Sequence, residues 1–293
     1  MGKRYVALIS LLIVVVLASG LFLTGCTQDQ KLPGIAWAEE ETLTYGIWTD
    51  NVLTGSLVIV TKRLPVGQQA LPKFPDEKYD VNSTSSGGTL ITKTAKDLSD
   101  NITMYSEALM NGFKPVASYK EVNTTDSQYT LKARYDGTRY FYSYNGGEEK
   151  KVRIKTGFMD NEIMYSIVRC YELESNYTTT FNLVDPTTGN KEALSVAVTA
   201  EGTQGGFEYV NGSGESAMAA ASTRTLAVSF TRTKAPVGKS LVVYYTVEDK
   251  TGDTGFYLTG DPAKGGGTNR SSHVPVMIQE NNVKYVLSKV IAN

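Results

Sequence analysis

The sequence is poor in the residues on which most catalytic and metal sites depend. It holds 2 cysteines and 1 histidine in 293 residues. No group of His, Cys and carboxylate residues has the spacing of metal ligands, and no serine lies in a nucleophile elbow. A lone histidine beside a strand end, such as His273, is typical of a surface or turn position. We therefore predict a non-enzymatic protein without a metal or cofactor.

A strong charge of one sign is also lacking. The full sequence has 29 basic and 30 acidic residues, and removing residues 1–25, which include Lys3 and Arg4, brings the net charge to −3. A balance of this kind excludes an extended basic surface for nucleic acid. Apart from Cys26 the chain has one thiol, Cys170, so an internal disulfide is excluded. Cys170 is predicted to be a small buried core residue.

The N-terminus has the pattern of a targeting segment. Lys3 and Arg4 precede an almost wholly apolar run over residues 6–23. The sequence Leu-Thr-Gly-Cys that ends at Cys26 looks like a bacterial lipobox, in which the cysteine thiol receives a diacylglyceryl group. An uncleaved transmembrane anchor is the alternative, because the apolar run is nearly long enough to span a bilayer. The order of basic start, apolar run and cysteine favours lipidation, and two acyl chains hold a protein durably on a membrane.

This interpretation predicts three segments and a location. Residues 1–25 are a signal peptide, residues 26–41 a lipidated tether, and residues 42–293 a single β-rich domain. The protein is then an extracytoplasmic, membrane-anchored lipoprotein, held at the outer leaflet of the cytoplasmic membrane or at the outer membrane.

Alternating residues predict a tyrosine-rich hairpin over residues 129–144. Its apolar side chains alternate with Thr130, Lys132 and Arg134. A turn at Asp136-Gly137 would set Tyr129 opposite Tyr144, Leu131 opposite Tyr142, and Ala133 opposite Tyr140. A three-residue loop at 145–147 then places Val152 and Ile154 on the same tyrosine face.

The residues after Gly157 change to a helical period. Ile163, Ile167 and Cys170 form an apolar stripe, Asp160 is a plausible N-cap, and Glu162 suits the positive end of a helix. A helix of about three turns does not stand alone in water, so we expect its stripe to lie on the tyrosine face.

Further strands are expected along the rest of the domain, joined as an antiparallel meander. A hairpin at Asn111-Gly112 would bring Tyr119 opposite Met104, on one face of its two strands. Residues 63–88, 202–222 and 251–272 have little periodicity and are predicted to be long loops. The remaining expected strands cover residues 42–48, 55–62, 90–94, 101–110, 178–184, 194–200, 225–231, 240–247 and 274–279, with a last hairpin at Asn281-Asn282.

The order of these elements resembles the bacterial domain of unknown function 3108 family. The likeness rests on the Tyr-Gly-Ile-Trp strand at residues 45–48, the two hairpins, and the Asp160-Asn161-Glu162 helix that leads into residues 177–181. The resemblance implies a lipoprotein-carrier-like half-barrel, which is mainly β: a curled antiparallel sheet with one amphipathic helix packed on its concave face. The long segments 63–88 and 251–272 depart from the usual pattern at the cavity mouth, and the resemblance transfers no catalytic residues.

Two functions of different class follow. The protein binds a lipid or another apolar ligand in a half-barrel cavity, or it is an envelope scaffold or interaction module whose core is filled by its own side chains. The inner face carries more apolar surface than a short helix covers, which favours the cavity slightly. The expected ligand-facing residues are Met104, Tyr119, Tyr129, Leu131, Tyr140, Tyr142, Tyr144, Ile163 and Ile167.

Overall fold

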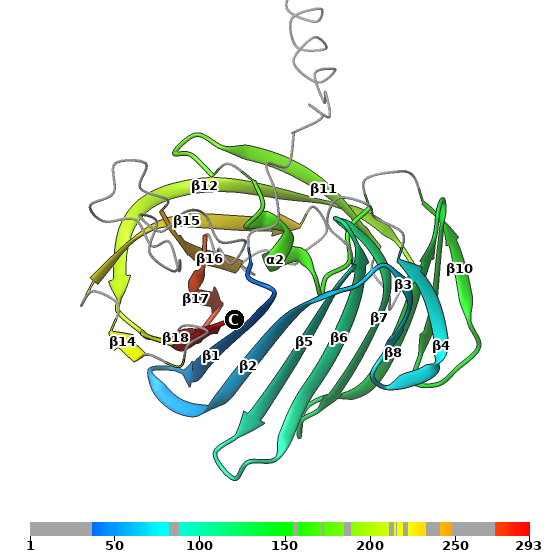
Figure 1. Ribbon diagram of the computed structural model, residues 1–293, viewed down its shortest axis with the longest axis horizontal. Helices are drawn as coiled ribbons and strands as arrows, with labels where there is room; N and C mark the ends of the chain where they lie inside the picture. The colour runs from blue at the N-terminus through cyan, green and yellow to red at the C-terminus, as the bar shows by residue number, and fades with distance from the viewer. Residues whose placement is uncertain are drawn as a thin grey trace, which may run out of the picture. The chain divides into compact units, whose positions relative to one another are not determined.

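The described part of the chain is mainly β (Figure 1). The structure is a computed structural model that describes residues 37–81, 88–154, 158–171, 173–184, 189–210, 214, 216–218, 222–232, 241–247 and 273–293. The chain divides into two compact units, Met1–Leu32 and Pro33–Asn293, and every described residue belongs to the second. Cys26 and the predicted loop 251–272 therefore lie outside the described residues.

Among the described residues, ten strands precede the helix α2 (Met164–Val168). They are β1 (Glu40–Thr49), β2 (Val52–Leu64), β3 (Gly67–Leu71), β4 (Phe74–Val81), β5 (Gly88–Asp97), β6 (Ile102–Asn111), β7 (Lys114–Asn123), β8 (Gln128–Asp136), β9 (Arg139–Tyr144) and β10 (Lys150–Arg153). After α2 come β11 (Thr178–Val184), β12 (Lys191–Gly205), β13 (Glu208–Val210), β14 (Ser216–Met218), β15 (Ser222–Arg232), β16 (Leu241–Thr246), β17 (Pro275–Glu280) and β18 (Val283–Ala292).

One large sheet holds most of these strands, in the order β10-β9-β8-β7-β6-β5-β2-β1-β18-β17-β16-β15-β12-β11. The first and last of the described strands, β1 and β18, pair in its middle. They join a first antiparallel meander, which runs from β1 to β10, to a second, which runs from β11 to β18. The two ends of this order, β10 and β11, are consecutive strands in the chain. No ladder joins them among the described residues, so the sheet is not closed, and the segment that contains α2 connects its two ends.

Side-chain alternation decides which face of the sheet is buried. In β1 and β2, Leu43, Tyr45, Leu57 and Ile59 are buried on one face, and cross-strand pairing sets Leu43 beside Ile59 and Tyr45 beside Leu57. The same row continues through the ladders into β5 with Ala95. Period-two burial of this kind is what a sheet with one covered face requires. We call this surface the inner face.

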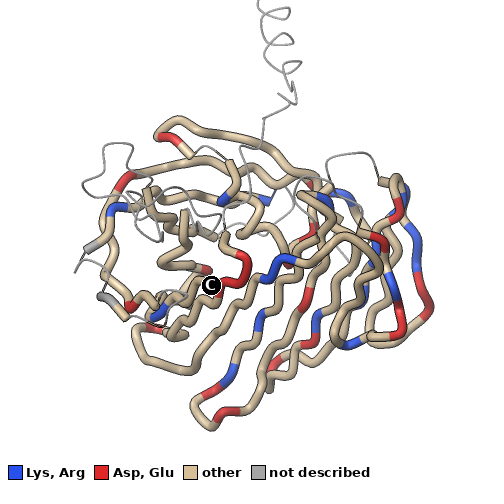
Figure 2. Tube along the Cα trace, viewed as in Figure 1, with Lys and Arg blue, Asp and Glu red and all other residues tan. Residues whose placement is uncertain are grey.

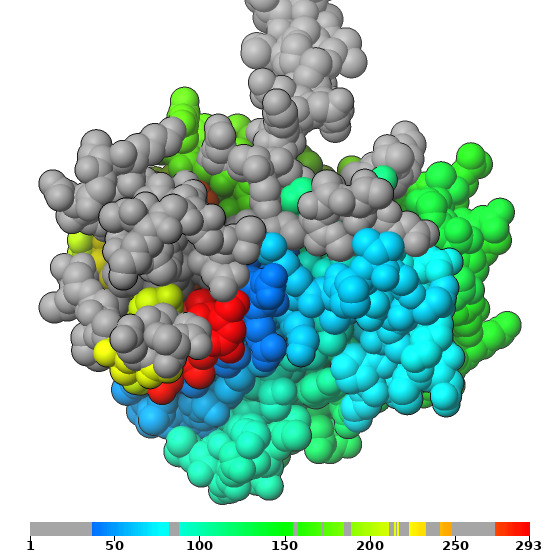
Figure 3. All heavy atoms as spheres, in the orientation of Figure 1, coloured from blue at the N-terminus to red at the C-terminus, as the bar shows by residue number. Residues whose placement is uncertain are grey.

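The predicted loop 63–88 contains a β-hairpin instead. Strands β3 and β4 pair with each other and pack on the outer face of the large sheet, where Leu71 and Val81 are buried against Leu109 and Ala117. The atoms of β3 and β4 form the cyan surface in front of this part of the sheet in Figure 3. The segment lacks clear periodicity because its apolar side chains are few and it is held by residues distant in the chain.

The predicted loop 202–222 is also wrong in part. Strand β12 continues to Gly205, and β13 pairs in parallel with the end of β18, at Tyr209 and Val290. Strand β14 pairs with β13.

The helix begins later and is shorter than the sequence indicates. It covers only the five residues of α2, and its N-cap is Ile163, without a side-chain capping bond. Asp160 is therefore not the N-cap. Ile163 and Ile167 are completely buried, and Met164 and Val168 belong to a core cluster with residues of β11, β12, β15, β16 and β17.

The tyrosine hairpin forms with a shifted turn. The loop is Gly137-Thr138, so Tyr140 pairs with Tyr135, Tyr142 with Ala133, and Tyr144 with Leu131. The predicted pairs are wrong by two residues, an even number, and the tyrosines therefore keep their common face. Val152 and Ile154 join the cluster around Tyr140 and Tyr142, which confirms the register predicted for β10.

The predicted pairing of Tyr119 with Met104 is wrong by three residues. Met104 pairs with Val122, and Tyr119 pairs with Glu107. An odd shift moves a side chain to the other face of a sheet. Tyr119 accordingly lies on the outer face, with its ring centroid 5.3 Å from that of Phe74 in β4.

Candidate functional site

Residues 158–162 lie at the gap between the two ends of the sheet. Phe158 forms a parallel bridge with Asn182 in β11, and the Met159 N–H donates to the Asn182 carbonyl at 2.8 Å. The two acidic residues that follow, Asp160 and Glu162, have buried side chains that reach the inner face of the other meander. This segment therefore connects both halves of the sheet.

Asp160 is bound to two strands of the first meander. Its Oδ2 accepts hydrogen bonds from Ser118 Oγ at 2.7 Å and from the Tyr135 hydroxyl at 2.9 Å, and its Oδ1 accepts the Glu162 N–H at 2.8 Å. Burial, with the neighbouring charge of Glu162, raises the pKa of Asp160 although these hydrogen bonds favour the ionised form.

Glu162 lies in a row of polar side chains across three neighbouring strands. Lys93, Ser106 and Lys120 are ladder partners on β5, β6 and β7, so they adjoin one another on the inner face. Glu162 Oε2 accepts from Ser106 Oγ at 2.7 Å and Lys93 Nζ at 3.2 Å, and its Oε1 accepts from Lys120 Nζ at 3.0 Å. Figure 2 shows basic and acidic residues distributed along these strands.

The two lysines decide the charge of Glu162. Burial alone would raise the pKa of this carboxyl, but the charges of Lys120 and Lys93 outweigh burial and hold the pKa far below its usual range. Glu162 in turn raises the pKa of Lys120. The row is thus a site in which two lysines and a serine hold a buried, ionised glutamate.

A pocket of about 90 Å³ lies beside this seat. Its walls are tyrosines: the rings of Tyr129 and Tyr144 are stacked with centroids 5.6 Å apart, and those of Tyr135 and Tyr140 are 5.0 Å apart. The complete lining comprises Ser118, Lys120, Tyr129, Leu131, Tyr135, Tyr140, Tyr144, Met159, Asp160, Asn161, Glu162 and Val184. Apolar ring faces and a charged, hydrogen-bonding base meet here, which suits an amphiphilic molecule.

Four of the nine predicted ligand-facing residues line this pocket, namely Tyr129, Leu131, Tyr140 and Tyr144. Tyr142 is buried in the tyrosine cluster and stacks on Tyr140 with centroids 5.4 Å apart. Met104 lies on the inner face and Tyr119 on the outer face. Ile163 and Ile167 are completely buried and are not among the residues that line the pocket.

Sequence reasoning missed the row of polar side chains that binds Glu162 beside the pocket; of its three members, only Lys120 lines the pocket. Lys93, Ser106 and Lys120 each occupy an inward position of a strand, where the alternation of apolar residues assigns no role to a lysine. A lysine at such a position needs a buried carboxylate, and this need was the available signal. Its partner is Glu162, 69 residues away from Lys93 in the chain.

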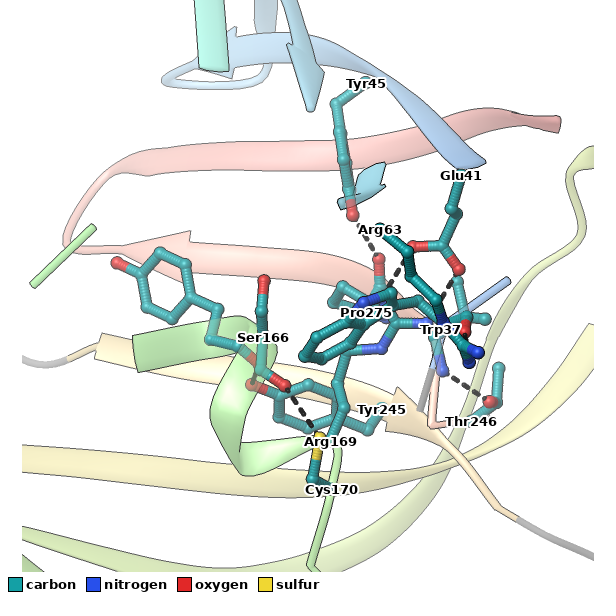
Figure 4. Close-up of polar contacts among 12 residues, drawn as sticks. Trp37, Glu41, Tyr45, Arg63, Ser166, Arg169, Cys170, Tyr245, Thr246 and Pro275 are labelled. Carbon is teal, nitrogen blue, oxygen red and sulfur yellow. Dashed lines mark hydrogen bonds and ion pairs between the residues drawn. The ribbon is translucent and has the colours of Figure 1, made fainter. Parts of the chain in front are cut away.

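A second buried polar group binds the helix to the first strand (Figure 4). Arg169, the C-cap of α2, forms an ion pair with Glu41 of β1 at 2.6 Å. Tyr45, four residues after Glu41 in β1, donates its hydroxyl hydrogen to the Pro275 carbonyl at 2.7 Å. Trp37 is completely buried, and its carbonyl accepts from Arg63 at 2.8 Å.

His273 and Cys170 are both core residues. His273 is 6 % exposed and its Nδ1 lies 3.0 Å from the Thr246 carbonyl, so of the predicted surface or turn position the surface part is wrong. It does lie in a bend of the chain, with φ 43°. Cys170 is buried as predicted, with Sγ 3.8 Å from the Ser166 carbonyl. Within the described ranges, no His, Cys, Asp and Glu residues group as metal ligands, and no helix is long and apolar enough to cross a bilayer.

Comparison with known proteins finds a similar solved structure and no family. No protein-family model and no curated protein matches the chain. A crystal structure of a beta-barrel-like protein of domain of unknown function DUF1849 from Brucella abortus is similar, with 7% sequence identity and a TM-score of 0.44. The match covers 88% of this chain and 99% of that chain. The resemblance to the domain of unknown function 3108 family stays a prediction.

Proposed function

We propose that the protein is a lipid-anchored cell-envelope protein without enzymatic activity that binds a lipid or a similar amphiphile in the tyrosine-walled pocket. In this proposal the sheet is a half-barrel with α2 on its concave face, and Cys26 carries the anchor. The observation that carries the binding function is the pocket itself, in which Tyr129, Tyr140 and Tyr144 face the Asp160 and Glu162 segment.

The volume and lining of the pocket limit the ligand. At about 90 Å³ it is far smaller than the ~300–1,000 Å³ of sites that enclose a drug-sized molecule. It therefore suits the end of a chain or a small headgroup, with the rest of the molecule outside. Leu131 and the tyrosine rings would contact the apolar part, and Asn161 and Lys120 would contact the polar part.

A fluorescent apolar probe tests this function. We expect 1-N-phenylnaphthylamine to bind the purified protein saturably and to be displaced by an extract of envelope lipids. Leu131→Trp fills the pocket and should weaken probe binding at least tenfold. Leu90→Trp is the matched control, because Leu90 is also half-buried on a strand but packs on the outer face beside the β3–β4 hairpin. A saturable signal that Leu131→Trp leaves unchanged would place the probe elsewhere and reject the pocket.

A specific observation also favours an interaction module. The cluster that holds Met164 and Val168 contains fourteen buried residues among those described, from α2, the second meander and, with Leu173, the segment between them. This part of the interior is filled by the protein's own side chains. Capture of the protein from envelope membranes, with Cys26→Ala as control, tests this alternative. Enrichment of an envelope protein together with absence of probe binding would favour the interaction module.

A further inference from the structure

Exposed apolar side chains gather at one end of the strands of the large sheet, around three neighbouring hairpin turns. Of the eight large apolar side chains that are exposed in the described part of the chain, six belong to the tips of three hairpins, β1–β2, β5–β6 and β17–β18, or to the strand positions beside them. Leu98 is 70% and Val52 63% exposed. We call this set the apolar rim; it comprises Trp48, Val52, Leu53, Leu98, Ile102 and Val286.

The strand registers bring these residues together. Trp48 pairs with Leu53, and Gly46 pairs with Val286. A Cβ atom built at Gly46 would lie 3.1 Å from Trp48 Nε1 and 3.2 Å from Leu53 Cδ1, so both side chains cover this glycine. On the neighbouring strands β5 and β6, Ile102 pairs with Lys96. In Figure 1 the turns of the β1–β2 and β5–β6 hairpins lie at the same end of the sheet's strands.

Polar groups of the same tips are bound within one turn or between two neighbouring turns. The Asp97 carboxylate accepts the N–H groups of Ser99 at 2.8 Å and Asn101 at 2.9 Å. Asp100 forms an ion pair with Lys96 at 2.9 Å. The carboxylate of Asp50 accepts from Asn282 of the β17–β18 turn at 3.1 Å. These polar groups thus have partners within the tips, and the exposed apolar side chains lie beside them.

We propose that the apolar rim inserts into the surface of a lipid bilayer. The proposal rests on the anchoring at Cys26 proposed above, because an anchored domain always remains close to a bilayer. Eleven residue steps separate Cys26 from the buried Trp37, and an extended chain of that length spans at most ~40 Å. Strand β1, which leads from there to Trp48, has 10 residues and is ~33 Å long. The tether is therefore long enough for the rim to reach the membrane that holds the anchor.

The composition of the rim suits this partner. Tryptophan is enriched at membrane–water interfaces, and Leu, Ile and Val side chains enter the adjoining acyl region. A group of exposed apolar side chains of this kind marks an interaction site in a soluble domain. The charged residues at these tips, Asp50, Lys96, Asp97, Asp100 and Lys284, carry no excess of positive charge, so apolar insertion and not attraction to acidic lipid is the expected source of binding.

The tryptophans make insertion measurable in the intact protein. The chain has 2 tryptophans; Trp37 is completely buried and Trp48 lies on the rim. Full-length lipidated protein is reconstituted into phosphatidylcholine vesicles whose acyl chains carry bromine, which quenches only nearby indoles. We expect tryptophan emission to fall by at least a third relative to vesicles without bromine, and Trp48→Phe to abolish the quenching.

Matched variants and flotation separate the outcomes. Leu98→Asp combined with Ile102→Asp should halve the quenching, whereas Val66→Asp should leave it unchanged, since Val66 is 57% exposed but lies at the other end of β2. Protein that floats with the vesicles but shows no bromine quenching overturns the rim proposal and leaves the anchor intact. Absence of flotation overturns both. If Trp48 is already shielded from aqueous acrylamide before vesicles are added, a second copy of the protein covers the rim, and this result also overturns the rim proposal.

Discussion

Arg169 and Glu41 form a bidentate pair, with Nη1 to Oε1 at 2.6 Å and Nη2 to Oε2 at 2.9 Å. The two side chains are 1% and 0% exposed, and the residues are 128 positions apart in the chain. The pair fixes the C-terminal end of α2 to the first strand of the sheet. It therefore links the segment between the two meanders to the strand pair that joins them.

Removing one member of this pair should destabilise the protein strongly. Glu41→Gln leaves the Arg169 guanidinium buried without its counter-charge, and the expected loss in the free energy of unfolding is about 3–5 kcal/mol. Urea unfolding followed by circular dichroism measures it. Glu149→Gln is the control, because the exposed pair of Glu149 with Arg134 should contribute less than about 1 kcal/mol. Equal losses in both variants would contradict the buried pair.

Stability should depend on the charge of Glu162 at acid pH. Because the folded protein holds the pKa of Glu162 below its unfolded value near 4.5, its stabilisation is complete above that pH and is lost as the pH falls below it. Asp160 acts in the opposite sense, since its pKa is raised and protonation relieves the cost of its burial. We expect Glu162→Gln to lower the free energy of unfolding by about 3 kcal/mol at pH 7, and the difference from wild type to shrink below pH 4.

Chemical unfolding at pH 7, 5 and 3 measures this dependence. Lys120→Met should reproduce the loss at pH 7, because it removes one of the two cations that hold Glu162 ionised. A difference between Glu162→Gln and wild type that stays constant from pH 7 to pH 3 would mean that Glu162 is not an ionised partner of the lysines.

The β3–β4 hairpin should depend on Phe74. Its ring packs edge-on against Tyr119, and Lys132 Nζ lies 4.0 Å from its centroid. We expect Phe74→Ala to cost about 2 kcal/mol and to expose the hairpin to limited proteolysis between Gly67 and Val81. Val66→Ala, just before β3, should change neither measurement. Unchanged proteolysis in Phe74→Ala would show that the outer-face contact does not hold the hairpin.

Cys26 should determine membrane attachment. Metabolic labelling with an alkynyl fatty acid is expected to tag the wild-type protein, and Cys26→Ala should lose the label and the processing of residues 1–25. Cys170→Ala is the control, since that thiol is buried in the core. Label that persists in Cys26→Ala would contradict lipidation, and an unprocessed membrane-bound product would favour the transmembrane alternative.

Local patterns predicted most strands because alternation and turn residues act over a few positions. The predicted tyrosine face is correct although its turn was misplaced, since a shift of two residues preserves the face. The turn is formed by Gly137, with φ 53°, and Thr138.

The error of three residues at Tyr119 has two parts. The turn is shifted by two residues, since Asn111 pairs with Lys114, and the register then shifts by one more between Leu109 and Met110, beside Pro115, which has no N–H to donate. The second shift moves Tyr119 to the other face. A bulge of this kind leaves no pattern in alternation.

Contacts between distant residues account for what the sequence could not predict. The site depends on Glu162 meeting Lys93 and Lys120, which are 69 and 42 positions away in the chain. Nothing in the local pattern of residues 160–162 distinguishes a carboxylate that caps a helix from one that enters a row of lysines. The hairpin of β3 and β4 was missed for the same reason, because its contacts come from other strands.

Native mass spectrometry of protein purified from its own envelope tests the binding function most directly. The account predicts a fraction of wild-type protein with an extra mass, released by organic solvent and identified there as an amphiphile. That mass should be absent from Leu131→Trp and retained in Leu90→Trp. Wild-type protein that carries only the mass of its lipidated chain, and that takes up no envelope lipid when incubated with it, would contradict the proposed pocket function.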